Sequence, residues 1–247
     1  MQPLITIITV TYNAENTLTP TMESVNAQTY TDFQHLIMDG ASSDRTLETA
    51  KRLATDRTEI FSEPDSGIYD AMNKGMTHAR GQYLIFLNAG DSFHSTDTLG
   101  LIARTIESNG YPGIVYGQTQ IVDSGRRYVA DRHLKAPEKL TYESFADGML
   151  VCHQAFIALA RIAPLYDTRY RFSADYDWCI QCLQHSRKNV YIPETLIDYL
   201  NEGTTTANHR KSLIERFRIM RYYYGTTKTI SKHIMFLPRY INRKNKS

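Results

Sequence analysis

Two acidic segments of the chain carry residue types suited to catalysis. The first, Phe86 to Asp91, is an apolar run that stops at a short polar turn, and the second, Ser173 to Trp178, follows about 80 residues later. A carboxylate at the end of a buried strand is well placed to hold a hard cation against a phosphate. A second carboxylate can take a proton from an incoming hydroxyl. These two roles are what the transfer of a group from an activated nucleotide donor requires.

The first 90 residues alternate between strand and helix patterns, and the elements they form would position Asp91. We predict strands at 4–11, 35–38, 59–61 and 82–87, separated by helices at 15–28, 45–54 and 65–79. This alternation predicts an α/β fold with an open, mostly parallel central sheet flanked by helices. Ligands of such sheets bind at the carboxyl ends of the strands, where Thr11, Tyr12, Asp39, Asn88 and Asp91 fall.

The pattern changes after about residue 111. We predict a hairpin of 114–122 and 126–133 around Asp123-Ser124-Gly125, then a helix at 175–185, a strand at 189–192 and a basic helix at 210–224. The chain therefore divides into a catalytic domain at 1–208, with halves at 1–110 and 111–208, and a C-terminal helical tail at 209–247.

The composition is that of an ordinary globular protein. The chain has 247 residues, of which 42% are hydrophobic, enough for one large α/β domain or two small ones. No apolar run reaches the ~20 residues that span a bilayer. The segment Met1 to Val10 lacks a basic stretch, so we expect no signal peptide. Three cysteines cannot build a disulfide framework, which favours a reducing, cytoplasmic location.

The net charge of +2 is unevenly distributed. The tail at 209–247 holds eleven Lys or Arg and one acid, whereas 1–208 has a net charge of −8. One interpretation of the tail is a helix packed on the domain and followed by a solvated end. The other, which we favour, is an interfacial segment attracted to anionic lipid at the cytoplasmic membrane. Binding to nucleic acid is disfavoured because the body is acidic.

Several candidate residues also have structural explanations. In the structural interpretation, Asp39 does no more than shape a turn, and Asp175 does no more than stabilise the start of a helix. Because Asp175 and Asp177 are two positions apart, at most one of them points into a site. His153 with Gln154, and His209, are further candidates. Cys179 and Cys182 have a redox spacing but lie inside a helical pattern, so we predict buried core cysteines.

A series of segments, taken in order along the chain, resembles family 2 glycosyltransferases of the GT-A fold. They are Ile7–Asn13, Ser24–Tyr30, Met38–Thr46, Ser62–Gly75 and the acidic segments named first, and the resemblance covers roughly residues 4 to 200. Ser62–Gly75 is similar to the subgroup that builds O-antigen, capsule and colanic-acid-like polysaccharides. The GxGxxG and Walker A motifs of other nucleotide-binding proteins are absent from the sequence.

The resemblance implies roles at matching positions. The nucleotide would be held by Thr11, Tyr12, Asn13, Asp39 and Asn88, with Asp70, Asn73 and Lys74 lining the diphosphate and sugar region. Asp91 matches the acid that binds Mn²⁺ or Mg²⁺, and Asp175 matches the catalytic base. Asn88 and Gly90 stand where the metal motif usually has acids, and Ala174 replaces a usual Glu.

The sequence thus predicts an inverting, metal-dependent glycosyltransferase. It would transfer a sugar from a nucleotide-diphosphate donor, a UDP-sugar by preference, to a hydroxyl of a glycan or lipid-diphosphate-linked acceptor in cell-surface polysaccharide biosynthesis. The missing QxxRW motif favours the addition of one sugar per encounter. A metal-dependent nucleotidyltransferase and a non-catalytic nucleotide-sugar-binding protein are the alternatives. The central expectation is that Asp91 and Asp175 converge at the carboxyl edge of the sheet.

Overall fold

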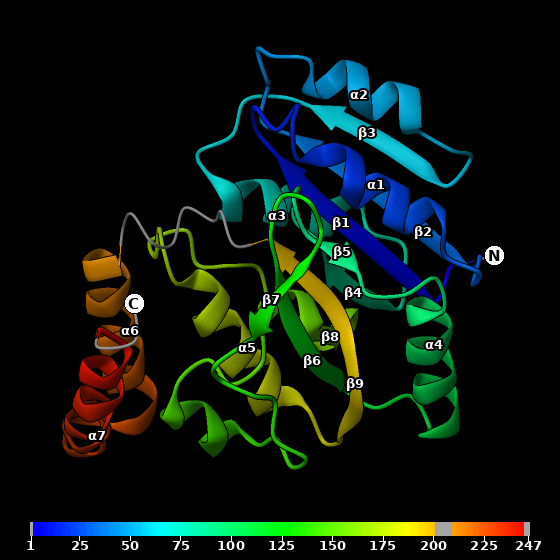
Figure 1. Cartoon of the computed structure of the whole chain (residues 1–247). Helices are drawn as coiled ribbons and strands as arrows, with labels where there is room; N and C mark the ends of the chain where they lie inside the picture. The colour runs from blue at the N-terminus through cyan, green and yellow to red at the C-terminus, as the bar shows by residue number, and fades with distance from the viewer. Residues whose placement is uncertain (1, 201–208, 245–247) are drawn as a thin grey trace.

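The N-terminal half is a parallel sheet with helical connections. A computed structural model describes residues 2–200 and 209–244 (Figure 1). β1 (Ile5–Thr11) pairs in parallel with β2 (Phe33–Asp39) and β4 (Tyr83–Phe86), and β2 pairs in parallel with β3 (Thr58–Ser62). The connections are α1 (Leu18–Asn26), α2 (Thr46–Leu53) and α3 (Ile68–His78). All residues of β1 and β2 are buried, as expected where both faces of a sheet are covered. The predicted α/β fold is confirmed.

The C-terminal half extends this sheet with strands of mixed direction. β8 (Phe156–Leu159) is antiparallel to β4 and to β6 (Ile114–Val122). β9 (Asn189–Leu200) runs parallel to β6, and β5 (Ser92–Phe93) pairs with β9. The strand order is β3-β2-β1-β4-β8-β6-β9-β5, and β7 (Tyr128–Asp131) pairs with β6 as the predicted hairpin.

Some elements were not predicted from the sequence. They are β5, β8, α4 (Thr98–Ser108) and the short 3-10 turns Tyr142–Asp147, His153–Ala155 and Ala160–Ile162. α7 (Thr226–Lys244) lies within the segment 209–247 that was predicted to be helical. β9 also continues to Leu200, although its predicted strand ended at Ile192. Pro193 interrupts the strand pattern in the sequence, and the pairing with β6 changes register nearby.

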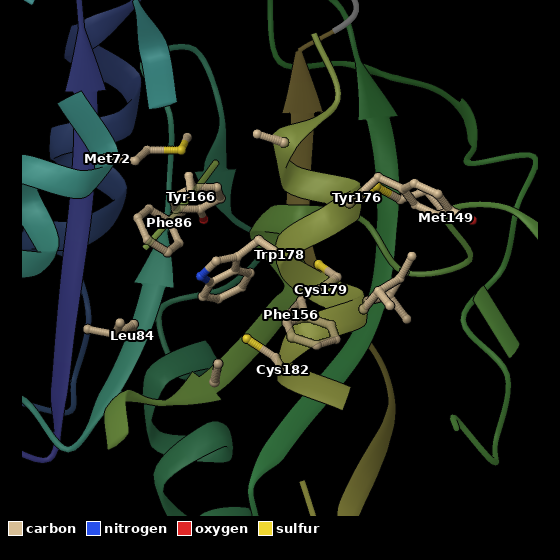
Figure 2. Packing of buried hydrophobic residues seen from close by; sticks show 14 of the residues in the cluster. Met72, Leu84, Phe86, Met149, Phe156, Tyr166, Tyr176, Trp178, Cys179 and Cys182 are labelled. Carbon is tan, nitrogen blue, oxygen red and sulfur yellow. The ribbon is translucent and has the colours of Figure 1, made fainter. Parts of the chain in front are cut away.

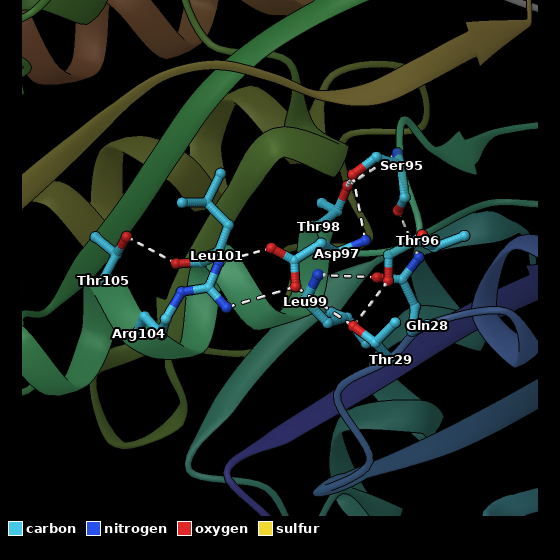
Figure 3. Close-up of polar contacts among 10 residues, drawn as sticks. All are labelled: Gln28, Thr29, Ser95, Thr96, Asp97, Thr98, Leu99, Leu101, Arg104 and Thr105. Carbon is cyan, nitrogen blue, oxygen red and sulfur yellow. Dashed lines mark hydrogen bonds and ion pairs between the residues drawn. The ribbon is translucent and has the colours of Figure 1, made fainter.

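The start of α4 is tied to the end of α1 by one buried side chain. Gln28 Nε2 donates to the carbonyl of Ser95 at 2.7 Å, while Gln28 Oε1 accepts from the backbone N–H of Leu99 at 2.9 Å (Figure 3). The same picture shows Asp97 between Thr29 and Arg104. The amide of Gln28 thus satisfies a free N–H of the first turn of α4, so this helix forms without a side-chain cap of its own.

An aromatic cluster fixes helix α5 (Ala174–His185) against the sheet. Trp178 projects from α5 toward Phe86 of β4, and their ring centroids lie 5.5 Å apart (Figure 2). Trp178 is fully buried, and its Nε1 donates to the carbonyl of Pro164 at 2.7 Å. Cys179 and Cys182 are free and buried in the same cluster, which confirms their prediction as core residues. The start of α5, which carries Asp175, is therefore held rigidly.

The C-terminal tail packs on the domain through its first helix. In α6 (His209–Tyr224), Ile219 and Met220 are buried in the same core cluster as Trp178. Helix α7 forms ion pairs with the 3-10 turn at 142–147, from Lys228 to Glu143 and from Lys232 to Asp147. Within the described parts of the chain, no helix combines the length and apolar character needed to cross a bilayer. The tail therefore packs on the domain through the buried side of α6, as the first of the two interpretations expected.

Candidate active site

The predicted site residues gather at the carboxyl edge of the parallel strands. Thr11 and Asp39 are the last residues of β1 and β2, and Asn88 follows β4 by two positions (Figure 1). The backbone N–H of Ala89 donates to the carbonyl of Val10, and that of Gly40 to the carbonyl of Thr11. The three strand ends therefore form one continuous rim.

One end of this rim combines a buried acid with an exposed aromatic ring. Asp39 accepts hydrogen bonds from Ser42 N–H at 3.1 Å, Ser42 Oγ at 2.5 Å and Ser62 Oγ at 2.6 Å. Tyr12 is 66% exposed. A Cβ added at Gly40 would lie 2.5 Å from Asp65 Oδ2 and 3.3 Å from the Tyr12 ring, so a larger residue here would require the Asp65 side chain to move. An exposed ring beside buried polar groups is suited to stacking a nucleobase.

Asn13 shapes the loop beside this ring. Its backbone is in the left-handed region, with φ of 48°, and its Oδ1 accepts a hydrogen bond from the backbone N–H of Ser43 at 3.0 Å. Thr11 Oγ1, in contrast, is buried and has no hydrogen-bond partner among the described residues. Asn13 therefore positions the loop, whereas the hydroxyl of Thr11 is buried at the end of β1 without a described partner.

The three candidates on α3 contact other parts of the protein. Asp70 accepts from Ser66 N–H at 2.9 Å, and Lys74 donates to the carbonyl of Pro64 and pairs with Glu63. Lys74 also lines a small hollow together with Asp39 and Asp65. A separate pair of hydrogen bonds joins the side-chain amide of Asn73 to the backbone of Tyr166. Only Lys74 thus borders the rim hollow directly, and the predicted contacts of all three with a diphosphate stay predictions.

Asp175, at the first turn of α5, is partly buried and keeps one oxygen open. Its Oδ1 accepts from Tyr69 Oη at 3.1 Å and from the backbone N–H of Tyr176 at 2.9 Å. Among the described residues, Oδ2 accepts no hydrogen bond. Burial and the neighbouring Asp175 raise the pKa of Tyr69 well above its usual value, so the phenol stays a donor. This geometry leaves a carboxylate oxygen free to receive a proton.

Asp177 points away from this position. Its Oδ1 accepts from Tyr223 Oη of α6 at 2.9 Å, and its Oδ2 accepts from Gln181 Nε2 at 2.7 Å. Oδ1 thus joins α5 to the tail, and Oδ2 is used within α5. Burial raises the pKa of this carboxyl group. Of the two acids that the sequence left open, Asp175 is the one that keeps an oxygen without a hydrogen bond among the described residues.

The 3-10 turn at His153–Ala155 lies between the two acidic regions. His153 Nε2 is 2.5 Å from Tyr166 Oη, and the His153 ring stacks on Phe86 at a centroid distance of 5.0 Å. Burial lowers the pKa of His153 to about 4, so the imidazole is neutral at physiological pH. Tyr166 also stacks on Tyr69, the partner of Asp175. His153 is therefore a buried link in an aromatic wall.

The next residue of that turn reaches the other acid. Gln154 Nε2 donates to Asp91 Oδ2 at 2.6 Å, and the backbone N–H of Leu200 donates to Asp91 Oδ1 at 3.0 Å. Asp91 is 4% exposed, and burial raises its pKa to about 7. A chain of contacts runs from Asp91 through the turn at 153–155 and the rings of Tyr166 and Tyr69 to Asp175. Asp175 is the more exposed of the two acids, and their convergence on one cleft stays a prediction.

The turn around Asp91 does not present an open set of ligands for a divalent cation. Asp91 is the only carboxylate in this turn, it is buried, and each of its oxygens already accepts a hydrogen bond, from the Gln154 amide or from the Leu200 N–H. Within residues 2–200 and 209–244, no group of three or more His, Cys, Asp or Glu could hold a metal ion. Mg²⁺ sites keep accessible carboxylate oxygens together with water and phosphate. The predicted Mn²⁺ or Mg²⁺ on Asp91 stays a prediction, and we derive no chemical step from it.

Three residues of the site were not predicted from the sequence. Tyr69 and Tyr166 build the wall beside Asp175, and Arg126 donates to the carbonyl of Gly90 at 2.7 Å. Tyr69 lies inside the segment Ser62–Gly75 that carries the resemblance, so its position held a signal. Arg126 lies in a hairpin turn, where an arginine has no distinguishing pattern. His209 begins α6, and its side chain lies outside what the structure describes.

Comparisons with known proteins agree with this architecture. The sequence profile described as "Glycosyl transferase family 2" matches residues 6–163. A PGL/p-HBAD biosynthesis glycosyltransferase of Mycobacterium bovis is 33% identical over 190 residues, covering 74% of this chain and 71% of that protein. The amylovoran biosynthesis glycosyltransferase AmsB of Erwinia amylovora is 28% identical over 210 residues, covering 78% of this chain and 68% of that protein.

Solved structures share the fold at low sequence identity. TarS 1–349 of S. aureus in complex with UDP-GlcNAc has a TM-score of 0.70 at 15% identity, covering 94% of this chain and 73% of that one. The mannosyltransferase PcManGT of Pyrobaculum calidifontis, with GDP-Man and Mn²⁺, has a TM-score of 0.64 at 15% identity, covering 96% of this chain and 76% of that one. The chain therefore belongs to glycosyl transferase family 2 and has the GT-A fold.

Proposed function

We propose that this chain is an inverting glycosyltransferase that transfers a sugar from a nucleotide-diphosphate donor to a hydroxyl group of a cell-surface glycan or its lipid-linked precursor. The observation that carries the proposal is Asp175, whose Oδ2 is open at the rim while Tyr69 holds its Oδ1. Family membership supports the reaction class. The relatives that act in PGL/p-HBAD and amylovoran biosynthesis support the acceptor class.

The reaction follows from a single displacement at the anomeric carbon. Asp175 accepts the proton of the acceptor hydroxyl as its oxygen attacks that carbon from the face opposite the leaving group. The bond from the anomeric carbon to the β-phosphate oxygen breaks, and the nucleoside diphosphate leaves with the electron pair. The hydroxyl of Tyr69 keeps Asp175 in one orientation, so the carboxylate does not have to be ordered during the reaction.

We propose a UDP-sugar as the donor, with the base stacked on Tyr12 and the nucleoside near Asp39. The UDP-GlcNAc complex of TarS supports UDP, while the GDP-Man complex of PcManGT keeps GDP in consideration. Mn²⁺ in the latter complex supports testing divalent cations as well. The donor screen should therefore include UDP-, GDP- and dTDP-sugars, with and without Mn²⁺.

The screen also separates the alternative reaction classes. A glycosyltransferase releases the nucleoside diphosphate, slowly by hydrolysis and faster once the right acceptor is present. A nucleotidyltransferase, which attacks phosphorus, releases pyrophosphate instead. A non-catalytic binding protein gives a dissociation constant but no product. We expect nucleoside diphosphate as the product; pyrophosphate would contradict the proposal, as would donor binding without any turnover across the panel.

The C-terminal tail supports a position at an anionic membrane surface on the cytoplasmic side. Its exposed large apolar side chains are Leu213, Ile214, Tyr222, Ile230, Ile234 and Met235. The exposed cationic residues Arg210, Lys211, Arg218 and Arg221 lie on the same helical hairpin. Apolar side chains mixed with Lys and Arg are what interfacial helices present to lipid. Such a position would bring the rim near lipid-diphosphate acceptors.

Vesicle sedimentation tests this position. Replacing Ile230, Ile234 and Met235 together by Ser should release the protein from phosphatidylglycerol vesicles, as should deleting residues 226–247. Replacing Val129 and Leu165, exposed apolar residues on the body, by Ser is the matched control and should leave binding unchanged. Equal vesicle binding by all variants, or no preference for phosphatidylglycerol over phosphatidylcholine, would contradict the membrane proposal.

A further inference from the structure

The turn after β4 excludes an acid from one position of the family's metal motif. Gly90 has φ of +105°, a conformation that side-chain-bearing residues rarely adopt. A Cβ at this position would also lie 3.0 Å from Leu200 Cδ2. The backbone conformation is thus the main reason why position 90 carries no side chain, since the Leu200 contact would need only a small shift. With Asn88 two residues earlier, the turn retains only the buried Asp91.

A guanidinium group lies at this turn. Arg126, in the turn between β6 and β7, donates from Nη1 to the carbonyl of Gly90 at 2.7 Å. Its Nη2 is buried and has no hydrogen-bond partner among the described residues. A buried donor without a partner costs about 1–3 kcal/mol, and a ligand atom that accepted a hydrogen bond from Nη2 would remove this cost. Arginine commonly binds phosphate oxygens, and with Nη1 bonded to Gly90, Nη2 is the donor left for such a contact.

Other unsatisfied polar atoms lie along the same rim. Asn88 Oδ1 and Thr11 Oγ1 are buried, and neither has a partner in the described parts of the chain. The hydrogen bond from Ala89 N–H to the carbonyl of Val10 holds these two residues on adjacent strand ends. The rim therefore offers a cationic donor, an amide oxygen and a hydroxyl. A ligand with phosphate oxygens and sugar hydroxyls has the complementary groups.

We propose that Arg126 neutralises the diphosphate of the donor in this chain, so that donor binding does not depend on a divalent cation. The proposal rests on the proposed function, since it assigns a binding role for the same nucleotide donor. Asp91 then has a structural role, in which it holds the Gln154 amide and the end of β9 beside the guanidinium. The attraction of Asp91 and Asp198 for Arg126 helps to keep the side chain at the turn.

Nucleotide binding measured by calorimetry tests this proposal. UDP, GDP, CDP and dTDP are titrated separately into the full chain, once in EDTA and once in MnCl₂. We expect at least one nucleotide to bind in EDTA about as tightly as with Mn²⁺. Arg126→Gln should weaken that binding about 10- to 100-fold, because a charge-assisted hydrogen bond contributes about 1.5–3 kcal/mol. Arg126→Lys keeps the positive charge but loses the planar guanidinium group. Its affinity for the nucleotide should therefore lie between those of the wild type and Arg126→Gln.

The neighbouring arginine provides the matched control. Arg127 is in the same turn, but its side chain is 84% exposed and pairs with Asp123. Arg127→Gln should therefore bind nucleotide like the wild type, and thermal melting checks that each variant is folded. Because cation dependence is measured on the unmodified chain, the proposal remains testable even if Arg126→Gln does not fold.

Each other outcome overturns a defined part of the argument. Binding that requires Mn²⁺ would refute the role of Arg126 and leave the proposed function intact. Wild-type affinity in a folded Arg126→Gln variant would refute it as well. Binding of none of the four nucleotides, with or without Mn²⁺, would overturn the proposed function and this inference together.

Discussion

The regions around Asp91 and Asp175 differ in how many of the carboxylate oxygens already accept hydrogen bonds. Asp91 is buried, and each of its oxygens accepts a hydrogen bond, from Gln154 and from the backbone of Leu200. Asp175 is partly exposed, and its two hydrogen bonds share one oxygen. The first region is built to hold its acid in place, and the second leaves its acid able to react. Residue type alone does not distinguish the two.

The strongest way to test this difference is to remove the charge of Asp175. Asp175→Asn keeps the shape of the side chain but cannot accept the acceptor's proton. General-base assistance is worth about 10²–10⁴-fold, so turnover should fall by that factor. The dissociation constant for the nucleoside diphosphate should change little, which calorimetry would measure beside the steady-state kinetics.

Asp177→Asn serves as the control for this experiment. It makes the same chemical change two residues away, where the carboxylate bonds to Tyr223 and Gln181. We expect turnover near that of the wild type. A large loss of turnover in Asp177→Asn with full activity in Asp175→Asn would exchange the roles of the two residues.

Substituting Asp91 should act on stability more than on chemistry. Asp91→Ala leaves the amide of Gln154 and the N–H of Leu200 buried without an acceptor, and each such group costs about 1–3 kcal/mol. The free energy of unfolding in urea should therefore fall by about 2–4 kcal/mol. Asp175→Asn, at a partly exposed position, should change it by less than about 1 kcal/mol. Unchanged stability of Asp91→Ala with lost Mn²⁺ binding would favour the metal role.

Removing the hydroxyl that orients Asp175 should have a smaller effect. Tyr69→Phe deletes one hydrogen bond to a carboxylate, worth about 1.5–3 kcal/mol, so turnover should fall about 10- to 100-fold. Tyr224→Phe is the matched control, since its hydroxyl donates to the carbonyl of Tyr142 beside the tail. Equal turnover in Tyr69→Phe and wild type would mean that Asp175 needs no orienting partner.

The two regions also differ in how far the sequence predicts them. The alternation of strands and helices predicts the parallel sheet and places Thr11, Asp39 and Asn88 on its rim, because buried parallel strands have a strong local pattern. β8 was missed because a four-residue strand has little pattern of its own. Within the site, the two oxygens of Asp91 and the position of Arg126 depend on contacts between distant segments. No local sequence pattern encodes such contacts. Which carboxylate oxygens accept hydrogen bonds could therefore be learned only from the three-dimensional structure.

The smallest expected effect concerns a buried histidine within the parallel half of the sheet. His35 lies within β2, with its Nε2 3.0 Å from Thr9 Oγ1, and burial lowers its pKa to about 3. In the unfolded chain a histidine titrates near pH 6.5, so below that pH the unfolded state binds a proton that the folded state does not. Because His35 stays neutral in the folded protein, the free energy of unfolding decreases as the pH falls from about 6.5 toward 3.

His35→Asn should remove this dependence while keeping a polar partner for Thr9. Between about pH 7.5 and pH 5, the wild type should lose about 2 kcal/mol more of its free energy of unfolding than the variant does. Urea denaturation of both proteins across this range measures the difference. His153, buried with a pKa lowered to about 4, contributes a loss of the same sign in both proteins and so cancels in the comparison. If the free energy of unfolding changed with pH in the same way for both proteins, the folded state would have to accommodate a charged imidazole at position 35. Water would then have access to the side chain of His35.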